Sequence, residues 1–408
     1  MASRDVHFWK EAIHDEIDSI MHNNTWVLAD LPPGCKALGC KWILKRKMKV
    51  DGTIDKYKAR LVIQGFRQKE GIDFFDTYAP VARISTIRLL LALTAIHNLV
   101  IHRMDVKTAF LNGDLDEEIY MKQPEGFVMP GNEHKVCKLK KSLYGLKQAP
   151  KQWHQKFDDV VLSNGFALNQ ADKCVYSKFD TSGKGVMICL YVDDMLIFGT
   201  DLEQVDKTKK FLSSSFDMKD MGEAEQAVSR VFKYLKGTIN YDLAYSGYPS
   251  VLEGYLDASW INNLEDHSST SGWVFLLRGG AISWASKKQT CITNSTMESE
   301  FVALSAAGKE AEWLRNLIYE IPLWPKPIST ISIRCDSAAT LAKAYSQVYN
   351  GKSRHLGGRH SIIRELIMAG VISVEFVRTQ FNLADHLTKG LARDLVHKAA
   401  VGMGFKSA

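Results

Sequence analysis

The sequence predicts an α+β protein with two domains, the second built on a mixed sheet with helices packed against it. The chain has 408 residues, enough for two or three domains of ordinary size. From about residue 250 three successive strands are followed by alternating helices and strands, which is typical of a mixed sheet. Before about residue 222, helices alternate with apolar segments of strand length. We therefore expect a domain boundary between residues 222 and 249.

Apolar spacing and turn residues define the elements expected in the first domain. Residues 84–96 have apolar side chains at helical spacing, and Asp51 with Gly52 is a strong two-residue turn signal between two strand-like segments. The expected elements are helices at 6–21, 84–96 and 150–163, a turn at 31–34, hairpin strands at 41–50 and 53–64, a strand at 99–104, and two strands around a turn within 187–198.

The second domain is expected to begin with its strands. The expected elements are strands at 251–258, 272–277, 280–285, 329–335 and 371–377, helices at 296–320, 337–347 and 358–369, and a last helix from about Ala384.

Composition indicates a folded protein. Hydrophobic residues make up 46% and charged residues 24% of the sequence, which excludes a disordered chain. The longest apolar stretches are too short or too interrupted to span a bilayer, and the N-terminus lacks the apolar core of a signal peptide. The seven cysteines are scattered and do not have zinc-site spacing. We expect a reduced intracellular protein, cytoplasmic or nuclear, that is neither secreted nor a membrane protein.

Positive charge is concentrated between residues 36 and 69. This segment contains eleven lysines and arginines against two aspartates, a local charge of +9 in a chain of net charge +6. A basic field of this size suits a polyanion such as nucleic acid. A solvated charged surface without a ligand is the alternative, and it is the commoner explanation of a single basic segment.

Three aspartates form the first candidate cluster. Asp193 and Asp194 are adjacent within an apolar hairpin, and Asp105 ends a strand-like stretch. Adjacent carboxylates repel each other, and a cation relieves that repulsion. Three carboxylates at strand ends could hold two Mg²⁺ ions about 4 Å apart, which activates a 3′-hydroxyl and stabilises a leaving phosphate oxygen. The alternative is that the two adjacent aspartates only form the turn.

Several segments resemble the reverse transcriptases of copia-type retrotransposons. Residues 191–194, Tyr-Val-Asp-Asp, are similar to the YxDD box of that family, and residues 104–113 are similar to its first palm motif. Residues 140–150 resemble the copia motif that positions template and nucleotide, and residues 56–62 and 76–81 resemble parts of the fingers. The matches occur in the family's order. The resemblance implies a fold of fingers and palm.

The resemblance also implies a role for each matching residue. Asp105, Asp193 and Asp194 would bind two Mg²⁺ ions, and Phe110 would be the bulky gate that clashes with a ribose 2′-hydroxyl. Gly145, which has no Cβ, would let the template backbone approach closely. The other candidates for nucleotide or template binding are Lys58, Arg60, Lys147 and Gln148, and either Lys58 or Arg60 would grip the incoming triphosphate.

A second set of acidic residues lies in the C-terminal half. Asp257 lies in a strand, Asp336 ends another strand, and Asp385 begins the last expected helix. Glu298 and Glu300 compete for a fourth place. Glu298 ends an S-x-x-E capping box and most simply reaches back to the helix start, whereas Glu300 adjoins the apolar stripe that faces the sheet and is our choice. Taken singly, each acid is explained as an ordinary strand-end or helix-start residue.

Together these four acids resemble the Asp–Glu–Asp–Asp set of RNase H, which is also a two-metal phosphodiesterase. The resemblance implies that Asp257, Glu300, Asp336 and Asp385 bind two Mg²⁺ ions and that the second domain has an RNase H-like α/β fold. Supporting matches to the copia form of RNase H are residues 268–275, 282–289 and 295–301. His355 and His360 lie in a later basic segment, where surface histidines are expected and phosphate contacts are the alternative.

One segment of the family's pattern is missing. Residues 218–224 normally lead into a primer grip, a thumb and a connection, but here residues 226–238 follow almost at once and resemble the helix that precedes RNase H. Roughly a hundred residues, a small domain, are absent. Because the primer grip and thumb hold the 3′-hydroxyl in line, we expect impaired polymerase activity. Lys219 in this region is either a proton donor to pyrophosphate or an ordinary surface lysine.

The predicted organisation is fingers and palm at 1–224, a remnant of the connection helix or linker at 225–248, an RNase H-like domain at 249–395, and a tail at 396–408. The implied function is RNA-directed DNA polymerase with ribonuclease H activity, acting on RNA templates, RNA–DNA hybrids and dNTPs. Two alternatives stay open. One is a hybrid-cleaving RNase H with an inactive polymerase, and the other is a non-catalytic remnant that binds nucleic acid through its basic segment.

Overall fold

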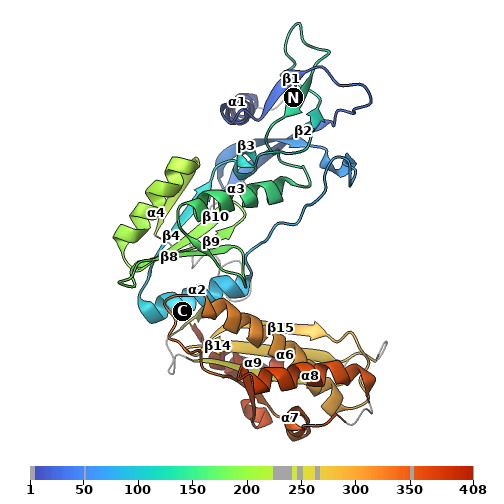
Figure 1. Ribbon diagram of the computed structural model, residues 1–408, viewed down its shortest axis with the longest axis vertical. Helices are drawn as coiled ribbons and strands as arrows, with labels where there is room; N and C mark the ends of the chain where they lie inside the picture. The colour runs from blue at the N-terminus through green and yellow to red at the C-terminus, as the bar shows by residue number, and fades with distance from the viewer. Residues whose placement is uncertain are drawn as a thin grey trace.

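The computed structural model describes residues 5–49, 52–223, 241–245, 251–261, 267–349 and 353–407. These residues form three stacked parts in Figure 1, which we call the finger layer, the palm sheet and the C-terminal sheet. The finger layer is N-terminal, the palm sheet has six strands, and the five-stranded C-terminal sheet lies at the opposite end of the molecule. This arrangement confirms the predicted fold class, fingers and palm followed by an RNase H-like mixed-sheet domain.

The finger layer contains two small sheets, β1-β6-β5 and β2-β3, with α1 packed on β3. Its elements are α1 (Val6–His22), β1 (Trp26–Ala29), β2 (Cys40–Met48), β3 (Ile54–Ile63), η1 (Gly65–Arg67), β5 (Tyr120–Met121) and β6 (Val136–Leu139). β2 and β3 form the predicted hairpin. Alternate residues of β3 are buried, so Leu61 and Ile63 enter the apolar core while Lys58 and Arg60 lie on the other side of the strand.

The palm sheet has the strand order β11-β4-β10-β9-β8-β7. Its strands are β4 (Val100–Val106), β7 (Ala167–Leu168), β8 (Val175–Phe179), β9 (Gly185–Tyr191), β10 (Asp194–Gly199) and β11 (Met218–Glu223), and η2 (Ala109–Asn112) follows β4. Two helices, α3 (Ala149–Ser163) and α4 (Leu202–Ser215), pack on this sheet, with Trp153, Phe157 and Phe216 in a shared aromatic core. Six of the seven residues of β9 are buried, as expected of a central strand covered on both faces.

Helix α2 (Ile84–His97) lies at the junction between the palm sheet and the C-terminal domain (Figure 1). Leu89, Leu90 and Leu93 have no exposed surface, and they belong to one apolar core that contains Phe198 of the palm and Ile282 of the C-terminal sheet. The palm and the C-terminal domain therefore share a continuous core through α2.

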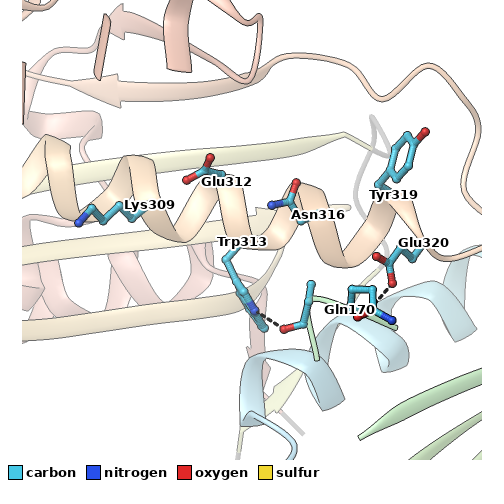
Figure 2. Close-up of a pocket in the computed structure, with 8 residues that line it drawn as sticks. Gln170, Lys309, Glu312, Trp313, Asn316, Tyr319 and Glu320 are labelled. Carbon is cyan, nitrogen blue, oxygen red and sulfur yellow. Dashed lines mark hydrogen bonds between the residues drawn. The ribbon is translucent and has the colours of Figure 1, made fainter. Parts of the chain in front are cut away.

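Polar contacts join the same two parts beside α2. Figure 2 shows α6 (Thr296–Tyr319), where the indole N–H of Trp313 donates to the carbonyl of Ala171 (3.0 Å) and Glu320 accepts from the backbone N–H of Gln170. These residues line an open cavity of about 450 Å³. The guanidinium of Arg88 lies 3.7 Å from the centre of the Trp284 ring. The junction is therefore held by specific contacts as well as by apolar packing.

The C-terminal sheet has the order β15-β14-β13-β16-β17. Its elements are β13 (Leu252–Ser259), β14 (Thr270–Leu277), β15 (Gly280–Lys288), β16 (Ile331–Cys335), β17 (Ile372–Phe376), α7 (Ala338–Tyr345) and α8 (Arg354–Met368), with α6 between β15 and β16. The first three strands pair antiparallel, and β13, β16 and β17 pair parallel. Parallel neighbours need a crossover connection, which the helices supply. The mixed sheet predicted from the sequence is confirmed.

The C-terminal segment differs from its prediction. A continuous helix from Ala384 was wrong, because the chain forms only the short η4 (Asp385–Leu387) after η3 (Thr379–Phe381), and α9 (Arg393–Gly402) begins later. Ala384 is pressed into a second apolar core with Met403, which holds the segment against the sheet instead of letting it extend as a helix. Residues assigned to a tail form part of α9 and β18 (Phe405–Ser407), which pairs with β12 (Tyr241–Leu243). Most of the expected connection remnant at 225–248 lies outside the described residues.

Candidate active sites

The palm sheet brings Asp105 and Asp194 side by side. The two residues are direct partners across the antiparallel pair β4–β10, so their side chains lie on the same face. Lys219 is the partner of Asp105 on its other side, in β11, and is exposed there. Asp193 belongs to the turn between β9 and β10. The three predicted carboxylates thus lie together at one end of the β9–β10 hairpin.

The turn that carries Asp193 is strained and is fixed by hydrogen bonds. Val192 has a φ of 61°, in the left-handed region that is costly for a β-branched residue. The indole N–H of Trp153 donates to the Val192 carbonyl (2.6 Å), and the Val106 N–H donates to the Asp193 carbonyl (2.8 Å). Sequence analysis missed Trp153, whose only signal is that it lies three residues beyond the motif at 140–150.

Charge in this palm cluster is only partly compensated. Arg103 donates two hydrogen bonds to Oδ1 of Asp194, from Nε (3.2 Å) and from Nη2 (2.8 Å). Burial raises the pKa of Asp105, and the negative charges of Asp194 and Asp193 raise it further. Within the described part of the chain, no group of ligand atoms within 4.8 Å of one another includes all three palm carboxylates. In this conformation the three palm carboxylates therefore do not converge on one ligand position.

Phe110, Tyr144 and Arg60 form a stack close to the palm carboxylates. The ring centres of Phe110 and Tyr144 are 5.0 Å apart, and the guanidinium of Arg60 lies 4.3 Å from the centre of the Tyr144 ring. Burial raises the pKa of Tyr144 to about 12, and Asp193 and Asp105 contribute to the increase. Burial lowers the pKa of Lys58, and nearby Arg60 lowers it further. Both predicted triphosphate ligands thus lie on the fingers strand that faces the palm cluster.

Glycine at position 145 is required by the protein's own backbone. Gly145 has a φ of 102°, and a Cβ built there would lie 2.3 Å from the carbonyl oxygen of Ile63 in β3. The Ile63 N–H in turn donates to the carbonyl of Tyr144 (2.9 Å). The close approach predicted for a template backbone is thus made here by the fingers strand.

Lys147 and Gln148 hold a loop of the finger layer. The ammonium of Lys147 lies 4.5 Å from the centre of the Phe74 ring and donates to the carbonyl of Gln68 (3.3 Å). Gln148 has no exposed surface, and its amide donates to the Asp73 carbonyl (3.1 Å) and accepts from Gln68 (3.0 Å). Both the NH2 group and the oxygen of the Gln148 amide therefore have hydrogen-bond partners inside the protein. In this geometry Gln148 does not offer the amide to a nucleotide or template as expected.

Four acidic residues meet at the C-terminal sheet. Asp257 lies in β13, Asp336 directly follows the neighbouring parallel strand β16, Glu300 lies on α6, and Asp385 lies in η4. Ligand atoms of Asp257, Asp336 and Asp385 lie within 4.8 Å of one another, and so do those of Glu300, Cys335 and Asp336. Asp336 thus belongs to both groups, and the structure brings all four predicted residues together.

Glu300 is a buried acid with an unused oxygen. It is 7% exposed, its Oε1 accepts from the Ala258 N–H (3.2 Å), and its Oε2 has no hydrogen-bond partner among the described residues. Burial raises the pKa of Glu300 to about 9, and Asp257 and Asp336 add to the effect. An orphaned carboxylate oxygen beside other carboxylates fits a divalent cation that prefers oxygen ligands. The thiol of Cys335 does not fit, because burial raises its pKa to about 12 and keeps it protonated.

The segment from Asn382 to Thr388 is pinned beside Asp257. Asn382 Nδ2 donates to the carbonyl of Leu256 (2.8 Å), and the Thr388 hydroxyl donates to the Asp257 carboxylate. Gly272 is the partner of Asp257 across β13–β14, and a Cβ built on it would lie 2.7 Å from Cγ2 of Thr388. Glycine at position 272 therefore provides the space that this segment occupies.

Lys389 enters the acidic cluster from the same segment. Its ammonium lies 3.1 Å from Oδ1 of Asp257 and 2.5 Å from Oδ1 of Asp385. Sequence analysis missed both Thr388 and Lys389. The spacing of Asp385 and Lys389, four residues apart with opposite charge, is the signal that could have identified Lys389.

Glu298 caps α6 as predicted. Its backbone N–H donates to the Ser295 hydroxyl (3.3 Å), and its Oε2 accepts from the Asn294 N–H (2.9 Å). The same carboxylate accepts from the Ser353 hydroxyl, and its Oε2 lies 3.5 Å from Nε2 of His355. Glu298 is therefore engaged at the helix start.

The expectation of a surface histidine was wrong for His360. It is 4% exposed, its Nε2 lies 3.1 Å from the Ser346 carbonyl oxygen, and its ring stacks on that of Phe301 with centres 6.2 Å apart. The ring fills space between α8 and α6, which the basic appearance of the surrounding sequence concealed. His355 is partly exposed and faces Glu298.

Comparison with known families decides the identity of the first half. A family model described as reverse transcriptase (RNA-dependent DNA polymerase) matches residues 23–246, more than half of the chain. The chain belongs to this reverse transcriptase family. The matched range contains Asp105, Asp193 and Asp194 together with the Phe110–Tyr144 stack.

The chain is similar to polyproteins of plant retrotransposons. The retrovirus-related Pol polyprotein from transposon TNT 1-94 of Nicotiana tabacum is 34% identical over 501 residues, with 96% of this chain and 38% of the relative covered. The corresponding polyprotein from transposon RE1 of Arabidopsis thaliana is 28% identical over 498 residues, with 97% and 34% covered. The chain thus spans less than two fifths of these relatives. Both alignments exceed its 408 residues, so the relatives have residues without a counterpart here.

Solved structures give weaker likenesses. RNase H1 from the halophilic archaeon Halobacterium salinarum is 20% identical, with 34% of this chain and 93% of that chain covered and a TM-score of 0.26. The foamy viral protease-reverse transcriptase in complex with dsDNA is 13% identical, with 91% and 81% covered and a TM-score of 0.27. Among the described residues, no helix has both the length and the apolar character of a membrane span.

Proposed function

We propose that this chain is an RNA-directed DNA polymerase and ribonuclease H fragment of a copia-type retrotransposon polyprotein. Each domain would catalyse phosphoryl transfer with two Mg²⁺ ions, on RNA templates with dNTPs in the palm and on RNA–DNA hybrids in the C-terminal domain. The polymerase activity is impaired because the segment that would contain the primer grip and thumb is missing. The proposed domains are residues 1–224 and 249–395.

The observation that carries this proposal is the pair of overlapping ligand groups in the C-terminal domain. Ligand atoms of Asp257, Asp336 and Asp385 form one group, and Glu300 and Asp336 belong to the other. A carboxylate shared by two groups is what two neighbouring ions require, since each ion needs several oxygen ligands and the ions lie about 4 Å apart. Bound ions would polarise the scissile phosphate and activate a water. The four acids would hold them, with the buried Glu300 losing its proton on binding.

In the palm, Asp105, Asp193 and Asp194 are proposed as the metal ligands. Phe110 would exclude a ribose 2′-hydroxyl, and its ring is fixed for this role by contact with Tyr144. Either Lys58 or Arg60, both on the fingers strand β3, is proposed to bind the triphosphate. For the residues at 145, 147 and 148 we propose a positioning role instead, because they attach the finger layer to the palm.

Nucleic acid is the proposed partner of the basic hairpin β2–β3. Lys41, Lys45 and Lys47 are exposed on this hairpin, where they could contact a phosphate backbone without further desolvation.

A second candidate function is an RNase H whose polymerase is inactive. The contrast between the two clusters favours it: the C-terminal acids belong to two groups of close ligand atoms that share Asp336, whereas no such group among the described residues includes all three palm carboxylates. Chemistry in the palm also needs a 3′-hydroxyl held close to the α-phosphate, and the missing segment would do that holding.

Two assays on the purified full chain test these functions. Cleavage of labelled RNA in an RNA–DNA hybrid with Mg²⁺ tests the C-terminal site, and Asp257→Asn should reduce it by about a hundredfold or more, since even neighbours of a metal ligand contribute 10- to 100-fold. Primer extension on an RNA template tests the palm, with Asp105→Asn as its control. The matched variant Glu298→Gln, which changes an acid outside both ligand groups, should retain hybrid cleavage.

The possible outcomes separate the candidates. Cleavage without extension supports the RNase H candidate, and extension abolished by Asp105→Asn supports an active polymerase. Cleavage that survives Asp257→Asn, or is absent from the wild type, would falsify the nuclease assignment. Absence of both activities with retained nucleic-acid binding leaves the non-catalytic remnant.

A further inference from the structure

In the C-terminal cluster, a positive charge is already present between two of the acids. The ammonium of Lys389 contacts Oδ1 of Asp257 at 3.1 Å and Oδ1 of Asp385 at 2.5 Å. These two acids, with Asp336, form one of the two ligand groups. An ammonium and a divalent ion both need the same carboxylate oxygens, and two cations in one small site repel each other. Lys389 and a metal ion therefore compete for this group.

We propose that Lys389 is a tethered cation that occupies the metal-free cluster and is displaced when a divalent ion binds. This proposal rests on the proposed metal-binding function of the cluster and adds to it a competitor supplied by the chain. In the metal-free protein, Lys389 stabilises Asp257, whose side chain is 1% exposed and would otherwise be a buried charge without a cationic partner.

The geometry of Lys389 permits displacement. Its side chain is 38% exposed, so the ammonium has an open path to solvent on a flexible four-carbon stem. The preceding backbone does not depend on Lys389, because Asn382 and Thr388 attach it to Leu256 and Asp257. The lysine can leave while the segment that carries Asp385 stays in place.

The raised pKa of Lys389 is consistent with an ammonium that stays charged at this position. Burial lowers the pKa of Lys389, but its hydrogen bond to Asp385 and the charge of Asp257 outweigh this and raise the pKa above its ordinary value. The second ligand group differs, because Oε2 of Glu300 has no hydrogen-bond partner among the described residues. Displacement of Lys389 is thus expected at the Asp257–Asp385 side of the cluster.

The test is metal affinity rather than activity. Mn²⁺ binding to the full chain is followed by the electron paramagnetic resonance of the free ion. The wild-type reference and every variant in this experiment carry Asp105→Asn to weaken binding in the palm. Lys389→Met keeps the length of the side chain but removes its charge. Lys309→Met, on the exposed side of α6, is the matched control for losing one positive charge from this domain.

Lys389→Met is expected to bind Mn²⁺ about tenfold more tightly, because the metal no longer has to displace an ammonium that is itself partly exposed to solvent, and such a contact contributes about one factor of ten. In EDTA the same variant should melt at a lower temperature than wild type, and saturating Mn²⁺ should abolish that difference. A purely structural lysine would weaken metal binding instead. Unchanged or weaker Mn²⁺ binding by Lys389→Met would overturn the proposal.

A separate variant distinguishes failure of the proposed function. Asp336→Asn should lose the Mn²⁺ binding that Lys389→Met strengthens, since Asp336 belongs to both ligand groups. If Asp336→Asn binds Mn²⁺ as the wild type does, the cluster is not a metal site and its proposed function fails. If Asp336→Asn loses binding while Lys389→Met is unchanged, the metal site stands and only the displacement is wrong.

Discussion

Gly272 lies directly opposite Asp257 in the β13–β14 pair, and the space left by its missing side chain is filled by Thr388. The segment that contributes Asp385 therefore lies partly in space that a Cβ at residue 272 would occupy. The same segment brings the hydroxyl of Thr388 and the ammonium of Lys389 to Asp257. One small residue on a strand thus decides whether four elements of the fold can form a common site.

Gly272→Ala should displace this segment and weaken metal binding. The new methyl group would lie 2.7 Å from Cγ2 of Thr388 and 3.0 Å from Cβ of Leu387, so the 384–389 segment must move. Overpacking of this kind costs about 1–3 kcal/mol. Mg²⁺ binding by calorimetry should weaken, because Asp385 moves away from Asp257. Gly358→Ala, a helical position with open space around it, is the control and should leave binding intact.

Glu300→Gln should remove a pH-dependent loss of stability in the metal-free protein. The folded pKa of Glu300 is raised to about 9 from the ordinary 4.5. Its protonated carboxyl therefore contributes fully to the free energy of unfolding below pH 4.5, and this contribution is lost as the pH rises toward 9, because the unfolded chain releases the proton first. In EDTA, the melting temperature of wild type should fall relative to that of Glu300→Gln between these pH values. With saturating Mg²⁺, wild type should instead melt at a higher temperature than Glu300→Gln, because the carboxylate is a good metal ligand and the amide is not. A melting-temperature difference that does not change with pH would contradict the assignment of the buried proton.

Trp153→Phe should loosen the turn that carries Asp193. The indole N–H is the donor to the Val192 carbonyl, and its removal leaves a polar group without its partner at a strained position. We expect a loss of about 1–3 kcal/mol in the free energy of unfolding, measured by urea denaturation. Val192→Gly is the complementary variant and should recover part of the loss in a double mutant, since glycine tolerates a φ of 61°. An equal loss from Trp153→Phe with and without Val192→Gly would show that the hydrogen bond does not restrain this turn.

Leu90→Ala should destabilise both domains together. Leu90 has no exposed surface and belongs to the core that the palm and the C-terminal sheet share. A buried Leu→Ala change costs about 2–5 kcal/mol. Native-state hydrogen exchange should therefore become faster in β9 and in β14 by similar factors, whereas Leu395→Ala at an exposed site should change neither. Faster exchange confined to the palm would mean that the two domains unfold independently.

Much of the fold followed from local pattern. The hairpin β2–β3, helix α2 and the antiparallel start of the C-terminal sheet were expected because apolar periodicity and turn residues report local conformation directly. The last helix was wrong for the opposite reason. Its residues are held by Asn382 and Thr388 against strands more than a hundred positions away, and no local pattern contains that information.

The candidate sites could also be predicted only in part. Acidic residues at strand ends were visible in the sequence, and the choice of Glu300 over Glu298 followed from helix geometry. Which neighbours neutralise those acids was not visible. Arg103 binds Asp194 and Lys389 binds Asp257 across pairings that only the folded chain creates. The buried position of Gln148 was concealed likewise, because its partners come from a distant loop.

Helix α2 has the palm on one side and the C-terminal domain on the other, so it belongs to the apolar core of both halves of the molecule. A break that divided the gene between these halves would give two products, each with an apolar patch exposed to water. Such products would be prone to aggregation. A loss of coding sequence that keeps the reading frame leaves both partners of α2 on one polypeptide. Burial of the apolar surface of α2 therefore requires both halves on one chain.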